Sequence, residues 1–177
     1  MADFSKAFEH TIKAEGGYVN DPDDLGGETY KGIARSRNSK WTGWVTIDLL
    51  KQKKGFPKNL DSDAQLQNSI REFYEVNYWD KVQGDCIADQ DVALSIFDFA
   101  VNAGVRTSSR LAQLSAGAKA DGVIGKKSLE AINSSDPYSF IATFTIAKIE
   151  RYVGICKERP TNRKYFYGWV RRAVGVT

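Results

Sequence analysis

"QDVALSIFDFAVNA", residues 90–103, carries apolar side chains around almost its whole circumference when it is read as a helix. A helix of this kind is typical of the centre of a helical bundle, where neighbouring elements cover every face. The flanking segments show the period of about 3.6 residues that marks amphipathic helices. The sequence therefore predicts a mainly α protein, with further helices near residues 4–15, 47–53, 108–115, 125–132 and 163–174.

Two more helices are expected from their capping residues. Ser62, with Gln65 three positions later, has the pattern of a capping box, and the helix that it opens should end near residues 77–82. Asp136 followed by Pro137 combines an N-cap with proline at the first helical position, and it should open a long helix. No clear linker is present, and a soft boundary near residues 85–91 separates a loop-rich half from a helical half.

Residues 15–34, EGGYVNDPDDLGGETYKGIA, break the helical pattern near the N-terminus. Gly16 and Gly17 should end the first helix, because glycine readily adopts the backbone conformation found beyond a helix C-terminus. Short β-compatible pieces follow at residues 18–19 and 29–33, with an acidic, glycine-rich loop between them. We therefore expect one small β-hairpin in this part of the chain.

Glu15 is expected on the apolar face of the first helix. It follows Phe4 by eleven residues, almost three turns, and so points along the stripe that Phe4 begins. A carboxylate facing a core is costly unless it is neutralised or paired, and burial favours the protonated form. A positioned, protonated glutamate can donate its proton to the leaving oxygen of a glycosidic bond. The alternative is a glutamate that turns to water or accepts hydrogen bonds from loop amides.

The loop after Glu15 offers a second carboxylate, which glycoside hydrolysis usually needs as base, nucleophile or cation stabiliser. Thr29 adds a hydroxyl at the start of the returning strand. Any single aspartate here is also a common turn residue, so each has a purely structural alternative. The candidate acids of the loop are Asp21, Asp23, Asp24 and Glu28.

Other kinds of site are not expected. Leu25 and Gly32 would occupy ligand positions of an EF-hand loop, which argues against calcium. The single histidine, His10, and two cysteines, Cys86 and Cys156, argue against zinc. His10 also falls on the polar face of its helix, so a catalytic triad is not expected. The two cysteines permit one bridge, but two buried thiols are the expectation. We expect no metal and no cofactor.

The charge is distributed unevenly along the chain. The net charge is +3, but residues 148–177 hold eight Lys or Arg and two Glu, a local charge of +6, which leaves −3 for the rest. A basic C-terminal face suits an anionic polymer such as nucleic acid or cell-wall glycan, or it is simply a solvated surface. No segment has the apolar length of a bilayer span. Residues 1–8 lack the apolar region of a secretory signal peptide.

Several motifs resemble those of a known family. EGGYVNDPDDLGG, followed by E, T and YKGI, is similar to the signature of the family 108 glycoside hydrolases, which are phage- and prophage-associated N-acetylmuramidases also labelled secretion activator proteins. The resemblance continues through NYWDKVQGD at residues 77–85 and FDFAVNAG at residues 97–104. ADGVIGKKSLEAI, residues 120–132, resembles the predicted peptidoglycan-binding segment of this family. Together the matches extend from about residue 8 to residue 160.

The resemblance implies a lysozyme-like helical fold, no cofactor, and cleavage of the β-1,4 bond between N-acetylmuramic acid and N-acetylglucosamine. The family's catalytic acid is the glutamate of its EGGY motif, which is Glu15 here. More distant phage lysozymes place an aspartate after eight intervening residues and a threonine after five more. Here Asp24 fits the first spacing, but four residues separate it from Thr29. We therefore expect Asp24 as the second carboxylate, with Asp21 as the alternative and Thr29 beside them.

A further set of residues is expected to bind the glycan. Trp79 is either a platform for a sugar ring or a large core residue. Asp98 and Asn102 are four residues apart and share a face of the central helix, where polar groups need partners. They either hold the loop or line the glycan cleft, or they cap backbone groups of a neighbouring element. The complete set is Tyr18, Asn20, Tyr30, Trp79, Asp98 and Asn102.

We expect a catalytic region over residues 1–90 and a helical region resembling a peptidoglycan-binding domain over residues 91–177, packed as one compact monomer. The expected partner is the glycan strand of peptidoglycan, with no nucleic acid and no membrane insertion. As an endolysin made in the cytoplasm, the protein would reach the wall by a holin-type or other export route. A lytic transglycosylase, which needs the acid alone, is the alternative enzyme. A non-catalytic peptidoglycan-binding or secretion-accessory protein is the alternative from another class.

Overall fold

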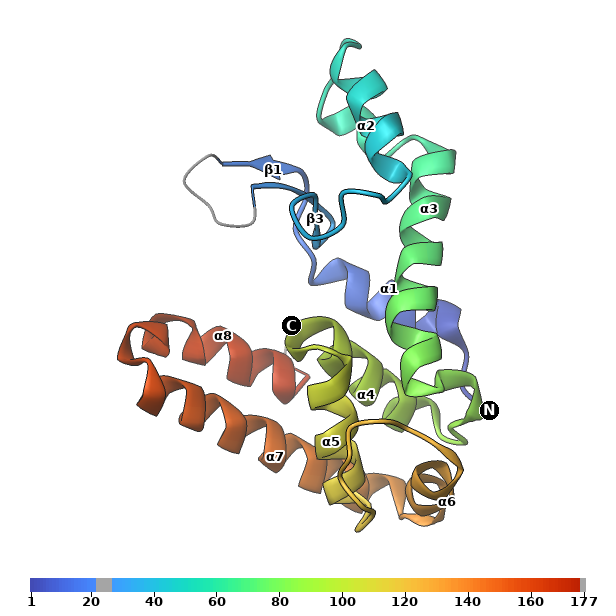
Figure 1. Cartoon of the computed structure of the whole chain (residues 1–177), viewed down its shortest axis with the longest axis vertical. Coiled ribbons are helices and arrows are strands. Elements are labelled where there is room, and N and C mark those ends of the chain that lie inside the picture. The colour runs from blue at the N-terminus through green and yellow to red at the C-terminus, as the bar shows by residue number, and fades with distance from the viewer. Residues whose placement is uncertain (22–26, 176–177) are drawn as a thin grey trace. The chain divides into compact units, whose positions relative to one another are not determined.

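The structure, a computed structural model, describes residues 1–21 and 27–175. The chain forms two compact units, one made of Met1–Ala7 with Asn77–Thr177 and the other of Phe8–Val76. Helices dominate the described residues, which confirms the prediction of a mainly α protein. The α-helices are α1 (Phe4–Lys13), α2 (Gly43–Lys51), α3 (Ala64–Tyr74), α4 (Gln90–Ala103), α5 (Val105–Ser115), α6 (Lys126–Ser134), α7 (Pro137–Glu158) and α8 (Arg163–Ala173) (Figure 1).

A small antiparallel sheet lies in the Phe8–Val76 unit, so the expected hairpin is present. The expected single β piece over residues 29–33 is instead two strands that pair Tyr30 with Ile33. Lys31 and Gly32 join them, with φ angles of 46° and 74°. Two successive positive φ angles are what a two-residue type I′ hairpin turn requires. The strand order is β1 (Val19–Asn20), β2 (Glu28–Tyr30) and β3 (Ile33–Ala34).

The core of the Phe8–Val76 unit forms where α2 and α3 pack together and side chains of the sheet join them. Trp41 meets Trp44 edge-on at 5.2 Å between ring centroids and meets Phe73 at 6.0 Å. These aromatic contacts join the loop before α2 to both helices. The buried side chains of this unit include Tyr30, Ile33, Trp44, Ile47, Leu60, Leu66, Ile70 and Tyr74.

The N-cap of α3 is Asp63 rather than the expected Ser62. The Asp63 side chain accepts a hydrogen bond from the amide of Leu66 at 2.8 Å. Aspartate and serine are about equally good N-caps, so the sequence pattern did not distinguish two neighbours. Helix α3 passes into a π turn at Glu75–Trp79 and a 3-10 turn at Asp80–Val82, so the helical path ends in the expected region.

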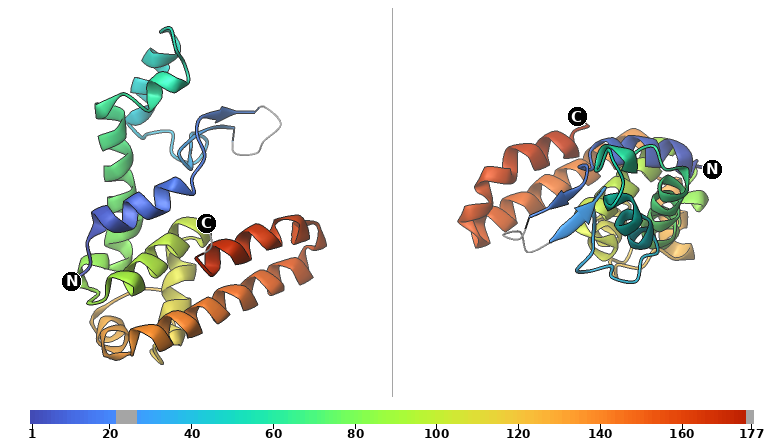
Figure 2. Two further views of the ribbon diagram at one scale, coloured as in Figure 1. Left: turned by 180° about the vertical axis from the view of Figure 1, so that it is seen from behind. Right: turned by 90° about the horizontal axis from the view of Figure 1, so that it is seen from above.

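Helix α4 is buried at the centre of the other unit, with the predicted bounds. It contacts α5 and α7. Phe99 of α4 meets Phe144 of α7 edge-on at 5.7 Å, and the hydroxyl of Ser108 in α5 donates to the carbonyl of Ile96 at 2.6 Å. Helices α7 and α8 lie side by side, as Figure 1 and both views of Figure 2 show. The buried residues of α4 are Val92, Ala93, Ile96, Phe97, Phe99 and Ala100.

The two compact units divide the chain differently from the expected regions 1–90 and 91–177. The segment that begins at Asn77 belongs with α4. The reason is Trp79, which is fully buried against Phe4 and Phe97 at 5.6 Å from each ring centroid. Because Trp79 packs on residues of this unit, its segment is grouped with α4. The boundary between the units therefore lies nearer the N-terminus than expected.

The two cysteines are both free thiols, Cys86 exposed and Cys156 buried. The expectation of a buried thiol is therefore wrong for Cys86, which ends a short 3-10 turn, Gly84–Cys86, at the surface. No helix within residues 1–21 and 27–175 has the length and hydropathy of a membrane span. In the same ranges, no three His, Cys, Asp or Glu side chains are grouped in a way that suits a metal ion.

Candidate active site

Glu15 lies two residues beyond the end of α1 and is half-buried. The α-helix ends at Lys13, earlier than expected, but the turn continues because the amide of Glu15 donates to the carbonyl of Ile12 at 3.2 Å. The side chain consequently lies on the same side of α1 as Phe8, since both side chains approach Tyr74 of α3.

The carboxyl group of Glu15 lies against the turn between β2 and β3. A Cβ atom built on Gly32 would lie 2.7 Å from Oε2 of Glu15 and 2.7 Å from the hydroxyl oxygen of Tyr74. Any side chain at residue 32 would therefore displace one of these groups. Gly32 also has a positive φ, which disfavours other residues independently of the available space.

Tyr74 fixes the position of this turn. Its side chain is buried near the end of α3, and its hydroxyl donates to the carbonyl of Lys31 at 2.7 Å. Its ring meets Phe8 of α1 edge-on at 5.6 Å, and the guanidinium of Arg71 lies 5.7 Å from the centre of the Phe8 ring. Three elements, α1, the β2–β3 turn and α3, thus converge at the carboxyl group. Glu15 as a whole residue is only half-buried.

Glu28, at the start of β2, belongs to a network of ion pairs. Its carboxylate accepts from Arg35 at 2.9 Å, from Lys51 at 2.6 Å and from the hydroxyl of Tyr18 at 3.1 Å. Burial acts to raise the pKa of Glu28, but the hydrogen bonds from Lys51 and Arg35 outweigh burial and lower it. Glu28 is therefore an ionised side chain paired with two cations, which suits a structural tie better than a free catalytic base.

The same network extends to Asp48 in α2. Arg35 forms a bidentate ion pair with the Asp48 carboxylate, at 2.8 Å from Nη1 to Oδ1 and 2.6 Å from Nη2 to Oδ2. The hydrogen bonds from Arg35 lower the pKa of Asp48 to about 2. Arg35, directly after β3, is thereby tied both to the start of β2 and to α2. These contacts hold the sheet against the helical part of its unit.

The residues predicted around the acidic loop have different surroundings. Tyr18 is partly buried, and its ring packs edge-on against Phe56 at 4.7 Å. Asn20 and Asp21 are exposed. Asp24, the favoured second carboxylate, lies outside the described residues, as does Asp23.

Thr29 and Tyr30 are neighbours on β2 that differ in burial, since Thr29 is partly buried and Tyr30 is buried. The Thr29 hydroxyl donates to the carbonyl of Gly27 at 3.4 Å. Tyr30 is 1% exposed, and its hydroxyl donates to Asp61 at 3.0 Å and accepts from Gln67 at 3.1 Å. Burial raises the pKa of Tyr30 to about 12. Tyr30 is thus a core residue with a satisfied hydroxyl, and this position gives no support to its assignment as a glycan contact.

Trp79 lies in the other unit and has the core position that the sequence left open. It is 0% exposed, and its indole N–H donates to Asp85 at 2.8 Å. With both ring faces covered, the indole offers no platform for a sugar ring.

Asp98 and Asn102, also in that unit, bond to neighbouring helices. Asp98 pairs with Arg172 of α8, at 3.1 Å from Nε and 2.9 Å from Nη2. Asn102 accepts a hydrogen bond from the hydroxyl of Tyr152 in α7 at 3.1 Å. These contacts correspond to the structural role, in which both residues bond to a neighbouring element. The partners, however, are side chains and not backbone groups.

Gly32 and Tyr74 were not predicted as site residues from the sequence. A signal for Gly32 was present, because a residue pair that ends in glycine between two short β pieces indicates a hairpin turn. Tyr74 gave no comparable signal, since it is one more apolar position on an amphipathic helix.

Residues 8–104 match the family described as Glycosyl hydrolase 108, which is more than half of the chain. The chain belongs to the glycosyl hydrolase 108 family. Residues 104–174 of this family 108 member match a second family, described as Predicted Peptidoglycan domain. The junction falls at Gly104, between α4 and α5. Together the two matches support a peptidoglycan-hydrolysing role.

A solved structure extends the likeness of this family 108 protein over nearly its whole length. The structure titled "Structure of Brucella abortus SagA" shares 29% sequence identity with it and covers 98% of this chain and 90% of that one, with a TM-score of 0.70. No curated protein matches the chain. The mainly helical fold with one small sheet therefore agrees with the lysozyme-like fold that the sequence motifs implied.

Proposed function

We propose that this protein is an N-acetylmuramidase that hydrolyses the β-1,4 bond between N-acetylmuramic acid and N-acetylglucosamine in peptidoglycan, with Glu15 as the general acid. The observation that carries the proposal is the position of the Glu15 carboxyl group beside Gly32 and Tyr74. All three residues belong to the segment that matches the glycosyl hydrolase family. A carboxyl group with fixed surroundings can direct its proton at one atom of a bound substrate.

The proposed reaction uses a carboxyl pair. Glu15 gives its proton to the bridging oxygen while the bond from that oxygen to the anomeric carbon breaks, and an oxocarbenium-like centre develops. Asp24, or Asp21 in its place, stabilises that centre or activates water, with Thr29 beside it. Water then adds to the anomeric carbon, and the proton it loses replaces the one that Glu15 gave away. Tyr18 and Asn20 remain the proposed glycan contacts of this region.

The central test compares wild type with Glu15→Gln, which keeps the shape of the side chain but cannot donate the proton. Removal of a general acid should lower the rate of peptidoglycan clearing by about 100- to 10,000-fold. The matched control is Glu9→Gln, an exposed glutamate of α1 that should clear at the wild-type rate. Equal clearing by Glu15→Gln and wild type, with both folded, would remove Glu15 from the mechanism. Binding without cleavage by the wild type would favour the non-catalytic alternative.

The second carboxylate is tested by Asp24→Asn and Asp21→Asn. We expect the larger loss of turnover from Asp24→Asn, because its spacing from Glu15 fits the wider pattern of phage lysozymes. The opposite order of losses would assign the role to Asp21. No loss from either change would contradict a carboxyl pair and favour a mechanism with the acid alone.

Analysis of the products separates hydrolysis from transglycosylation. A muramidase leaves a reducing end on muramic acid that borohydride converts to the alcohol, whereas a lytic transglycosylase leaves a 1,6-anhydro end that borohydride does not change. We expect mass spectra of digested peptidoglycan to show the reducible product. Anhydro products alone would replace the proposal with a transglycosylase.

We further propose that the enzyme acts as an endolysin-type monomer that meets its substrate after the inner membrane is permeabilised. Cells that express it in the cytoplasm should lyse only when a holin or chloroform opens that membrane. Lysis without permeabilisation would contradict this setting. Sedimentation equilibrium of the purified protein measures its molecular mass and so tests whether it is a monomer.

A further inference from the structure

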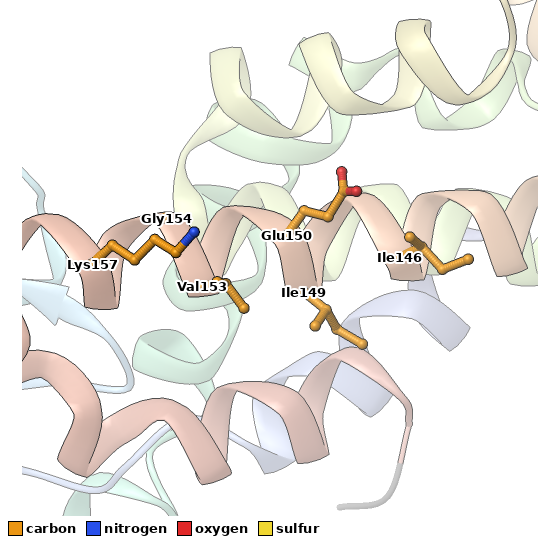
Figure 3. Close-up of a pocket in the computed structure, with 6 residues that line it drawn as sticks. All are labelled: Ile146, Ile149, Glu150, Val153, Gly154 and Lys157. Atoms are coloured by element: carbon orange, nitrogen blue, oxygen red, sulfur yellow. The ribbon is translucent and has the colours of Figure 1, made fainter.

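A shallow groove follows one face of α7, in the unit that contains the predicted peptidoglycan domain. Its first part has a volume of about 400 Å³, and every residue that lines it comes from α7 (Figure 3). Because these residues recur at spacings of three and four, they form a single stripe along the helix. The lining residues are Ile146, Ile149, Glu150, Val153, Gly154 and Lys157.

The groove continues between α7 and α8. A second hollow of about 350 Å³ shares Val153 and Lys157 with the first, so the two are contiguous. Its other lining residues are Cys156, Arg163 and Phe166. We call the combined surface the α7–α8 groove. Each part lies within the size range of ligand sites, roughly 300–1,000 Å³.

Gly154 leaves the floor of the α7–α8 groove open. It lies inside the 22-residue helix α7, and a Cβ built on it would meet no atom within 4 Å. Glycine is among the least favourable residues inside a helix, so its presence there weakens α7. In Figure 3 the side chain of Lys157 extends along the helix towards Gly154. A ligand backbone can therefore approach the bare helix beside a positive charge.

The lining is mainly aliphatic, with one aromatic ring, that of Phe166, and with charged groups beside it. Ile146 is 59% exposed and Val153 is 38% exposed, and because both lie on the same stripe of α7 they present apolar surface to solvent along the groove. Lys157 and Arg163 are exposed cations, and Glu150 adds one carboxylate. The groove thus suits a ligand that presents small apolar groups, carboxylates and an amine together.

We propose that the α7–α8 groove binds the stem peptides of peptidoglycan rather than its glycan strands. Stem peptides carry alanine methyl groups, free carboxylates and the amine of a diamino acid, which match the aliphatic and charged lining, whereas the groove has only one aromatic lining residue, Phe166, to offer a sugar ring. The carboxylates pair with Lys157 and Arg163, the methyl groups contact Val153, and the amine faces Glu150. The choice of peptidoglycan as ligand rests on the proposed function.

The first experiment measures binding of the full-length Glu15→Gln protein to purified sacculi, with their stem peptides present or removed by an amidase. We expect weaker binding to the stripped sacculi. Lys157→Glu with Arg163→Glu should weaken binding to intact sacculi by about tenfold or more, because attraction becomes repulsion. Lys53→Glu with Lys54→Glu makes the same charge change on exposed residues that follow α2, outside the 104–174 match, and should have little effect.

The second experiment fills the groove without altering charge. Gly154→Gln should keep or raise the melting temperature, since glutamine favours helix more than glycine does, and should weaken binding to sacculi. Gly168→Gln is the matched control, because Gly168 lies within α8, its added Cβ also meets nothing within 4 Å, and it does not line the groove.

Three results would overturn the proposal. They are equal binding to intact and stripped sacculi, unchanged binding of both groove variants, and a dimer in sedimentation that the groove variants dissociate. The proposed function is tested separately, because the groove variants with Glu15 intact should cleave soluble, peptide-free glycan at the wild-type rate. Loss of cleavage in Glu15→Gln and loss of binding in the groove variants can each occur without the other.

Discussion

Oε2 of Glu15 lies 2.7 Å from the point where residue 32 would carry a Cβ atom, so the carboxyl group occupies the space that Gly32 leaves empty. The same glycine adopts the positive φ that the turn between β2 and β3 needs. One residue therefore sets both the path of the backbone and the room for the proposed acid. This coupling leads to the first prediction.

Gly32→Ala should impair activity more than stability. The positive φ costs an alanine about 1–2 kcal/mol, and the added methyl group must displace Glu15 or Tyr74, so we expect at least a tenfold loss of turnover. Gly27→Ala is the control, because Gly27 also has a positive φ, 59°, but its Cβ would meet nothing within 4 Å. Urea unfolding and turnover of soluble glycan measure the two effects. Equal turnover in both variants would show that the close approach does not matter.

Tyr74→Phe should loosen the turn that faces Glu15. The change removes the partly buried hydrogen bond to the Lys31 carbonyl, which should lower the free energy of unfolding by about 1 kcal/mol. We also expect a lower kcat with little change in KM, because the acid and not the substrate loses its support. Tyr138→Phe, at an 86% exposed tyrosine of α7, should change neither quantity. A selective rise in KM would instead indicate that Tyr74 touches the glycan.

Asp98→Asn tests whether Asp98 is structural. It breaks the pair with Arg172, in which the two side chains are only 16% and 18% exposed, and should lower the free energy of unfolding by about 1–3 kcal/mol. Turnover of soluble glycan should stay unchanged while the protein is folded. Asp91→Asn, an exposed position in the first turn of the same helix, serves as control. A higher KM for the Asp98 variant would restore its role in binding substrate.

Lys148 should make stability rise with pH above neutrality. It is 4% exposed, its ammonium donates to Ser95 at 2.7 Å, and it lies 4.5 Å from the centre of the Phe144 ring. Burial lowers the pKa of Lys148 to about 8, although the charge of Asp98 acts in the opposite direction. Between that value and its ordinary 10.5, the unfolded chain binds a proton that the folded chain has lost, so unfolding becomes harder as pH increases.

The expected increase in the free energy of unfolding between pH 8 and pH 9.5 is about 2 kcal/mol. Lys148→Met should remove this increase and stabilise the protein at pH 7. Urea titrations followed by circular dichroism measure both. The titration should stop at pH 10. Burial raises the pKa of Tyr152 to about 12, so above pH 10 the free energy of unfolding should fall again as pH increases. The same rise in the methionine variant would assign it to other groups.

The helical part of the fold was readily predicted from the sequence. Residues 90–103 form α4 with the predicted bounds, between the N-cap Asp89 and the C-cap Gly104, and Asp136 caps α7 as expected. Local signals decide such elements. The Lys31-Gly32 turn was missed because residues 29–33 resemble one continuous strand when their pairing is unknown.

The site itself was predicted only in part. The direction of Glu15 follows from helical periodicity, but its partners come from α3 and from a turn. Glu28 is bound to Lys51, and Asp98 to a residue 74 positions away, and no local pattern indicates such pairings. Whether Trp79 is covered depends on Phe4 and Phe97, so its role required the tertiary structure.

The hydrogen bond between Tyr18 and Glu28 has a consequence for engineering. Tyr18 precedes the segment 21–27 and Glu28 follows it. Their hydrogen bond, together with the ion pairs of Glu28 to Arg35 and Lys51, therefore uses only side chains outside that segment. Substitutions within this segment that keep Asp21 and Asp24 therefore leave these side-chain bonds in place. Libraries limited to such substitutions are a practical way to vary the surroundings of the proposed second carboxylate.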